Sequence, residues 1–197
     1  PAYIVALAVG PFEYHPVPGL SVPGRIVTPK GQSAMAAEAA RLTPPIMSRL
    51  EEYFGIPYPY AKFDQIAVPE YVYGAMENAG LVTFTDRLLL MDPEKPSFSQ
   101  RRRLAAVIAH ETAHMWFGDL VTMGWWNGIW LNEAFATFME IAACDAYAPH
   151  WERWTTFGLE RSVAFETDSL SSTRSVEYEV HSPADCEGMF DVLTYQK

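Results

Sequence analysis

The amino-acid sequence predicts an α+β fold in which short strands come first and longer helices follow. Apolar runs rich in β-branched residues and bounded by glycine or proline lie in the first half of the chain, as is typical of strands. Segments with apolar residues three and four positions apart dominate the second half, as is typical of amphipathic helices. With 197 residues, 49% hydrophobic and 19% charged, the chain can form one domain, or one and part of another.

The predicted strands are short and separated by turns. An apolar run at residues 3–9 ends at Gly10-Pro11, and about twenty residues rich in proline and glycine follow it. The expected strands lie at residues 3–9, 25–28, Phe63–Val68 and Leu81–Thr85, with 88–91 as a further candidate.

The first predicted helix spans residues 33–54 and stops at Gly55. Pro44-Pro45 is expected to kink it or to split it in two, because proline removes a helical hydrogen bond. The later helices are expected at residues 97–118 (begun by Ser97 or Ser99 and ended by Gly118), 131–147 and 151–165.

The second predicted helix carries His110, Glu111 and His114 as H-E-T-A-H. Histidines four residues apart lie on one face of a helix, so both imidazoles can reach one metal ion. Glu111 points to a neighbouring side, where it can handle a metal-bound water without ligating the metal. This short pattern also arises by chance in surface helices. Its support comes from the apolar residues at helical spacing around it, which would bury one side of the helix.

Glu133 follows His114 after eighteen intervening residues, in the first turn of the next predicted helix. Its neighbours are mostly apolar, and a buried acid needs a partner. Three protein ligands plus one open position are the layout of a catalytic zinc site, so we expect one zinc ion held by His110, His114 and Glu133. Thr137, one turn further on, either hydrogen-bonds a ligand histidine or is an ordinary helix threonine.

The charge balance argues against nucleic-acid binding. The chain holds 24 acidic and 14 basic residues, for a net charge of −10. The basic run at residues 101–103 is expected to form salt bridges or a solvated helix face. No apolar stretch approaches the roughly 18 residues that would span a membrane. Cys144 and Cys186 lack C-x-x-C spacing and are expected to be free thiols.

Five separate segments stand in an order that is typical of one enzyme family. They are F-G-I-P-Y-P at 54–59, G-A-M-E-N at 74–78, H-E-T-A-H-M-W-F-G-D-L-V-T at 110–122, W-L-N-E-A-F-A-T-F at 130–138 and F-D-V-L-T-Y-Q-K at 190–197. With them, nearly the whole chain resembles the catalytic domain of zinc aminopeptidases of the aminopeptidase N type, which are gluzincin metallopeptidases. The resemblance implies a thermolysin-like catalytic lobe, truncated at the C-terminus, with a mainly antiparallel N-terminal sheet before the helices that carry the zinc site.

The resemblance implies a hydrolytic site as well. His110, His114 and Glu133 would hold the zinc ion, as the spacing also predicts. Glu111 would act as the general base, and Tyr195 would stabilise the oxyanion. A structural tyrosine in the core is the alternative for Tyr195, because only its upstream context supports the match.

The same resemblance implies where a peptide substrate lies. Glu77 would bind its free α-amino group, Gly74 and Ala75 would meet its backbone, and Met76 would line the pocket for its first side chain. The alternative is that Glu77 and Asn78 are ordinary turn residues. The expected partners are therefore peptides with a free amino terminus.

Family members also carry further domains. Residues 1–10 would be the end of a preceding β-domain or a connection to it, and residues 11–197 an incomplete catalytic domain. A preceding β-domain would supply another amine-binding acid, and a helical domain would follow. Residues 1–197 alone are therefore expected to be a weak catalyst.

The leading expectation is a zinc-dependent aminopeptidase that hydrolyses the N-terminal peptide bond with a zinc-activated water. A related hydrolase of the leukotriene-epoxide branch is one alternative, although that branch usually differs at the position of Ala75. A non-catalytic peptide-binding module on a peptidase fold is the other. It is disfavoured because all the expected catalytic and metal-binding residues are present.

Overall fold

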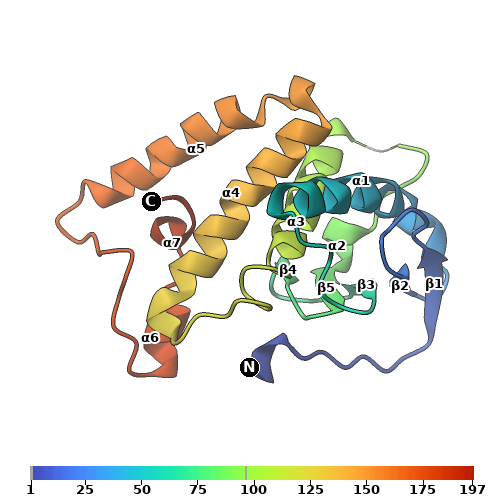
Figure 1. Cartoon of the computed structure of the whole chain (residues 1–197), viewed down its shortest axis with the longest axis horizontal. Coiled ribbons are helices and arrows are strands. Elements are labelled where there is room, and N and C mark those ends of the chain that lie inside the picture. Colours follow the sequence, from blue (N-terminus) through green and yellow to red (C-terminus); the bar gives the residue numbers. More distant parts are fainter. Residues whose placement is uncertain (1, 96) are drawn as a thin grey trace.

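Five strands form a sheet on one side of the molecule, and the helices cover it and extend away from it (Figure 1). This computed structural model describes residues 2–95 and 97–197 and confirms the α+β class. The strands are β1 (Phe12–Pro16), β2 (Gly24–Pro29), β3 (Phe63–Val68), β4 (Ala75–Met76) and β5 (Leu81–Thr85). The helices are α1 (Ala37–Phe54), α2 (Asp86–Leu89), α3 (Phe98–Ala113), α4 (Ile129–Tyr147), α5 (Arg153–Asp168), α6 (Pro183–Glu187) and α7 (Val192–Gln196).

The sheet has the strand order β1-β2-β3-β5-β4. β1 pairs with β2 and β4 with β5 in antiparallel fashion, whereas β2 and β5 both run parallel to β3. The expected mainly antiparallel sheet is therefore wrong in detail, because two of the four pairings in the described chain are parallel. The short strand β4 lies at one edge of the sheet and contacts α3, which brings the sheet edge to the H-E-T-A-H helix.

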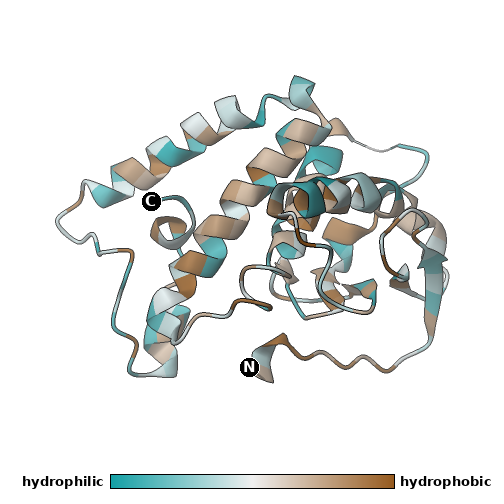
Figure 2. Cartoon of the chain, viewed as in Figure 1, coloured by the Kyte–Doolittle hydropathy of each residue, from teal (hydrophilic) through white to brown (hydrophobic). Residues whose placement is uncertain are grey.

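Helix α3 lies in the core, with α1 and α4 packed against it. Leu104, Ile108 and Ala109 on α3 are fully buried, and Trp116 just beyond it stacks on Phe54 at the end of α1, with ring centroids 4.9 Å apart. Figure 2 shows apolar residues along most of α4, as expected for a helix that crosses the middle of the molecule. The histidine-bearing helix is thus held by its neighbours on more than one side.

Helix α1 is continuous from Ala37 to Phe54, so the expectation that Pro44-Pro45 splits it is wrong. A proline inside a helix costs about 3 kcal/mol. The fully buried Leu42, Ile46 and Leu50 each contribute roughly 1.5–3 kcal/mol by burial, which outweighs that cost. Gly55 ends the helix as predicted, with a left-handed φ of 63° and its N–H donating to the Glu51 carbonyl.

Two predicted strands are absent from the described chain. Residues 3–9 form a 3₁₀ turn at Ala2–Ile4 and then an unpaired extended stretch. There Val5, Leu7 and Val9 are exposed, so the apolar pattern finds no neighbouring strand to pair with. The candidate strand at 88–91 overlaps α2, which the structure places at Asp86–Leu89.

The strands at Phe63–Val68 and Leu81–Thr85 are confirmed at the predicted bounds, and residues 25–28 lie within β2. Helices α4 and α5 confirm the last two predicted helices, shifted by two or three residues at some ends. Helix α3 follows Ser97 as predicted but stops at Ala113, before Gly118. Among the basic residues, Arg101 forms the expected salt bridge, with Glu38, and both cysteines are free thiols.

Candidate metal centre

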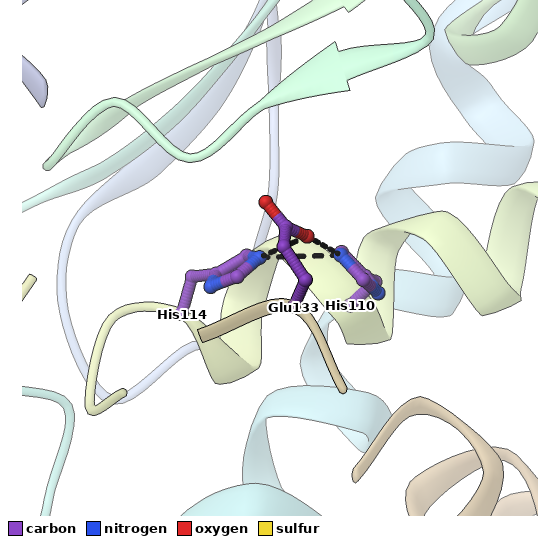
Figure 3. A group of neighbouring side chains, drawn as sticks. All are labelled: His110, His114 and Glu133. Atoms are coloured by element: carbon purple, nitrogen blue, oxygen red, sulfur yellow. Dashed lines mark hydrogen bonds and ion pairs between the residues drawn. The ribbon is translucent and has the colours of Figure 1, made fainter. Parts of the chain in front are cut away.

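Three side chains from two helices converge on one point (Figure 3). His110 lies in the last turn of α3, His114 directly follows that helix, and Glu133 lies near the start of α4. The Nε2 atom of His110 lies 3.2 Å from Nε2 of His114 and 3.2 Å from Oε2 of Glu133. His114 Nε2 lies 3.5 Å from the same Oε2 atom. All three side chains predicted to bind metal are therefore brought together.

These separations suit a small tetrahedral cation. Zinc bonds to nitrogen and oxygen of about 2.0–2.2 Å would place tetrahedral ligand atoms roughly 3.3–3.6 Å apart. The outer nitrogen of His114, Nδ1, is 3.0 Å from the Phe117 carbonyl, which can only accept a hydrogen bond. Nδ1 therefore carries a proton, and Nε2 faces the centre, where its lone pair can bind a cation once Nε2 has released its own proton. Two imidazole nitrogens and a carboxylate at this spacing fit zinc well.

The electrostatics of the centre favour positive charge. Burial alone would lower the pKa of His114, but the carboxylates of Glu77 and Glu133 outweigh it and raise this pKa to about 9. Burial would raise the pKa of Glu133, but hydrogen bonds from His110 and His114 hold it well below its usual range. The carboxylate is thus ionised and attracts a cation.

A glycine lets the chain pass close to the centre. Gly118 has a φ of +136°, and a Cβ there would lie 3.0 Å from Nδ1 of His114. A side chain at this position would be strained and would push against the imidazole. The prediction that Gly118 ends α3 is wrong, because α3 stops at Ala113. Gly118 instead shapes the loop whose Phe117 carbonyl orients His114.

Glu111 lies beside the centre and faces Glu77. Carboxylate oxygens of Glu111 and Glu77 and a ring nitrogen of His114 lie within 4.8 Å of one another. Burial, opposed by the two histidines of α3, raises the pKa of Glu111 to about 8. A carboxylate with a raised pKa next to a metal-binding group can accept and release a proton near neutral pH.

Glu77 directly follows β4, the edge strand of the sheet. It is buried, and the amide of Asn78 holds the turn after it by accepting a hydrogen bond from Thr83 and donating one to the Tyr3 carbonyl. Gly74 is exposed, and Ala75 and Met76 are half-buried on β4. These predicted substrate-binding residues therefore lie along one free strand edge that ends at the centre, where an extended peptide can pair.

Tyr195 reaches the centre from α7. Its ring is stacked on the ring of His110, with centroids 6.2 Å apart and an interplanar angle of 27°. Burial, with the neighbouring carboxylates of Glu133 and Glu111, raises the pKa of Tyr195 well above its usual value, so the hydroxyl keeps its proton. It can act as a hydrogen-bond donor to an oxygen at the centre.

Two acidic residues at the site were missed by the sequence reasoning. Glu140 Oε2 lies 3.6 Å from the outer nitrogen of His110, so Glu140 rather than Thr137 faces that histidine. Its spacing of seven residues from Glu133, two turns on one helix face, was a usable signal. Asp119 is buried, and neither of its carboxylate oxygens has a hydrogen-bond partner among the residues described. Nothing in the local sequence marked it.

The comparison with known protein families decides the affiliation of the chain. Residues 38–197 match the peptidase family M1 domain. The chain belongs to peptidase family M1. This family is zinc-dependent in general, and His110, His114 and Glu133 form a group of side chains able to hold a metal ion.

Several known aminopeptidases align with almost the whole chain. It is 40% identical to Aminopeptidase M1-A of Oryza sativa subsp. japonica and 42% identical to Probable aminopeptidase 2 of Sulfurisphaera tokodaii. It is 40% identical to Alanine/arginine aminopeptidase of Saccharomyces cerevisiae. Each alignment covers 99% of this chain but only 22–25% of the relative. No helix that the structure describes is long and apolar enough to cross a membrane.

Proposed function

We propose that this chain carries the active site of a zinc-dependent aminopeptidase, which hydrolyses the first peptide bond of substrates with a free amino terminus. The observation that carries the proposal is the triangle of donor atoms from His110, His114 and Glu133, with Glu111 beside it. Membership of family M1 and the names of the relatives support the same activity.

The chemistry follows from the positions of these groups. A zinc ion held by the triangle would polarise the scissile carbonyl and lower the pKa of a bound water to roughly 7. Glu111, which is not needed as a ligand, accepts the proton of the attacking water and passes it to the leaving amine. The Tyr195 hydroxyl donates a hydrogen bond to the oxygen that becomes negative.

The exopeptidase character is assigned to Glu77. Its carboxylate, at the end of β4, pairs with the α-ammonium group of a peptide that lies along Gly74 and Ala75. Because the ammonium group is anchored there, the first peptide bond is the one that reaches Glu111. Met76 on the same strand contributes to the pocket for the first side chain.

Metal analysis and an aminoacyl-arylamide assay on the full-length protein test this proposal together. Protein purified without chelator should hold one zinc per chain and release the arylamine. The variant with both His110→Ala and His114→Ala should lose both properties. The matched control replaces two histidines outside the centre, His150→Ala and His181→Ala, and should keep both. Full zinc content in the first variant would disprove the ligand assignment.

A further inference from the structure

Each histidine of the centre has an outer nitrogen that needs a hydrogen-bond acceptor. The two histidines have acceptors of different kinds. For His114 the acceptor is the Phe117 backbone carbonyl, 3.0 Å away. For His110 the facing group is the Glu140 carboxylate, with 3.6 Å between Nδ1 and Oε2. No other partner of this Nδ1 is recorded in residues 2–95 and 97–197. The orientation of His110 therefore depends on a side chain, whereas that of His114 depends on the backbone.

Glu140 is itself held from outside the centre. Its other oxygen, Oε1, accepts a hydrogen bond from Nη2 of Arg153 over 2.8 Å. Arg153 is the first residue of α5 and is 8% exposed, and the Glu140 side chain is 15% exposed. With one oxygen directed to Arg153 and the other to His110, the carboxylate has little freedom to rotate. Arg153, Glu140 and His110 form one line of contacts from α5 through α4 to α3.

We propose that Glu140 and Arg153 are positioning residues that orient His110 for metal binding, an inference that rests on the proposed zinc site. A carboxylate acceptor fixes the tautomer of a ligand histidine and raises the basicity of its metal-binding nitrogen. The gap of 3.6 Å is longer than a hydrogen bond, and we expect it to shorten when His110 binds the metal. Within residues 2–95 and 97–197, Arg153 has no hydrogen bond or ion pair with a metal-binding residue, so we assign its effect to Glu140.

The surroundings leave room for substitution. Glu140 and Arg153 line a cavity of about 410 Å³ between α3 and α5, together with Arg102, Glu160 and others. Removing the charge of Glu140 therefore does not overpack the core. Glu160 lies on the wall of the same cavity without a recorded contact to a histidine, which makes Glu160→Gln the matched control.

Glu140→Gln tests the carboxylate. Arg153 and His110 face different oxygens of Glu140, and glutamine replaces one of these oxygens with an NH₂ donor, so one of the two partners loses its acceptor. Chelator competition on the full-length protein should show zinc bound about 10–100-fold more weakly than in the wild type, with Glu160→Gln unchanged. Wild-type zinc affinity in Glu140→Gln would overturn the proposal.

Arg153→Gln tests whether Arg153 acts on His110 through Glu140. It should weaken zinc binding when Glu140 is present and should add no further loss in the E140Q background. If Arg153→Gln lowered zinc affinity by the same factor in the wild type and in Glu140→Gln, Arg153 would act independently of Glu140. If Arg153→Gln does not fold, as circular dichroism of the metal-free protein will show, Glu140→Gln still decides the role of the carboxylate.

Imidazole nitrogen NMR of the zinc-loaded protein supplies a readout that is independent of turnover. In Glu140→Gln the Nδ1 resonance of His110 should shift while that of His114 stays in place, and shifts of both or neither would contradict the proposal. Comparison of His110→Ala with Glu140→Gln distinguishes the role of Glu140 from the metal site itself. Loss of zinc in His110→Ala with normal zinc binding in Glu140→Gln would remove this inference alone. Retention of zinc in His110→Ala would remove the proposed function.

Discussion

The aromatic ring of Tyr195 lies stacked on the imidazole of His110, one centroid 6.2 Å from the other. The two residues are 85 positions apart in the sequence and belong to α7 and α3. Helix α7 packs against α4 and α5, and Asp191 caps it by accepting from the N–H groups of Leu193 and Thr194. A short helix therefore holds the Tyr195 ring beside His110. The role of its hydroxyl can be tested by substitution.

Tyr195→Phe keeps the ring and removes only the hydroxyl. Because an oxyanion donor acts mainly in the transition state, kcat for an aminoacyl-arylamide should fall by on the order of a hundredfold or more. KM and zinc content should change little. Tyr178→Phe, at an exposed tyrosine, serves as the control. A kcat close to the wild-type value would return Tyr195 to a purely structural role.

Arg174→Ala should loosen the segment that carries Tyr195. The Nη2 atom of Arg174 donates to the Met189 carbonyl, to Asp191 Oδ1 and to Thr194 Oγ1, at 3.2, 2.6 and 2.7 Å. Asp191 keeps the N–H groups of Leu193 and Thr194 as donors, and the Met189 carbonyl keeps the Thr194 hydroxyl. The loss is therefore that of the guanidinium hydrogen bonds alone, about 1.5–3 kcal/mol in unfolding free energy for bonds to a charged group. Denaturant unfolding and kcat should both report the change, whereas Arg87→Ala, at the exposed residue of α2, should alter neither. Unchanged kcat would mean that Tyr195 does not depend on this contact.

Glu111→Gln should separate metal binding from proton transfer. The side chain lies beside the triangle of ligand atoms, so the variant should keep its zinc. Without a carboxylate to accept the proton, turnover should fall by about 10²–10⁴-fold. Zinc analysis and steady-state kinetics on the same preparation measure both effects. A variant that loses its zinc would instead place Glu111 among the ligands.

Glu77→Ala should change which substrates are cleaved. The carboxylate attracts an α-ammonium group, so kcat/KM for free amino termini should fall by roughly tenfold to a hundredfold, equivalent to about 1.4–2.8 kcal/mol. The already low rate on amino-blocked substrates should hardly change. The ratio of the two rates, measured for wild type and variant, is the test. An equal loss on both substrates would show that Glu77 supports the fold rather than the amine.

Asp119→Asn should stabilise the metal-free protein in a pH-dependent way. Burial, with the neighbouring Glu77, raises the pKa of Asp119 to about 7, above the value near 3.8 expected in the unfolded chain. The folded state thus binds the proton more tightly, and the stability that this proton confers is present below about pH 4 and lost as the pH rises through about 7. The variant avoids that loss.

The gain from Asp119→Asn should therefore be small near pH 4 and reach on the order of 1–3 kcal/mol at pH 8. Denaturant unfolding at the two pH values measures it, with Asp145→Asn as the control. A gain that does not depend on pH would mean that the buried carboxylate is already compensated in the folded protein.

The sequence alone determined the features that depend on local spacing. Histidines four residues apart share a helix face whatever packs around them, so the pairing of His110 with His114 follows from their spacing. The bounds of Phe63–Val68 and Leu81–Thr85 followed from short apolar runs between turn residues. Glu133 was marked by an acid in an apolar helix, which requires a partner.

Only the tertiary structure decided the features that depend on contacts between distant segments. Packing energies, which the local sequence pattern does not contain, settle three such features. They decide whether a strand pairs in parallel, whether residues 3–9 find a neighbouring strand, and whether α1 continues through Pro44. The same holds for Arg153, which reaches Glu140, the residue that faces His110, only because α5 folds back beside α4. Side chains brought together by folding carry no signature in the spacing of their own residues, because the contact exists only once both helices are packed.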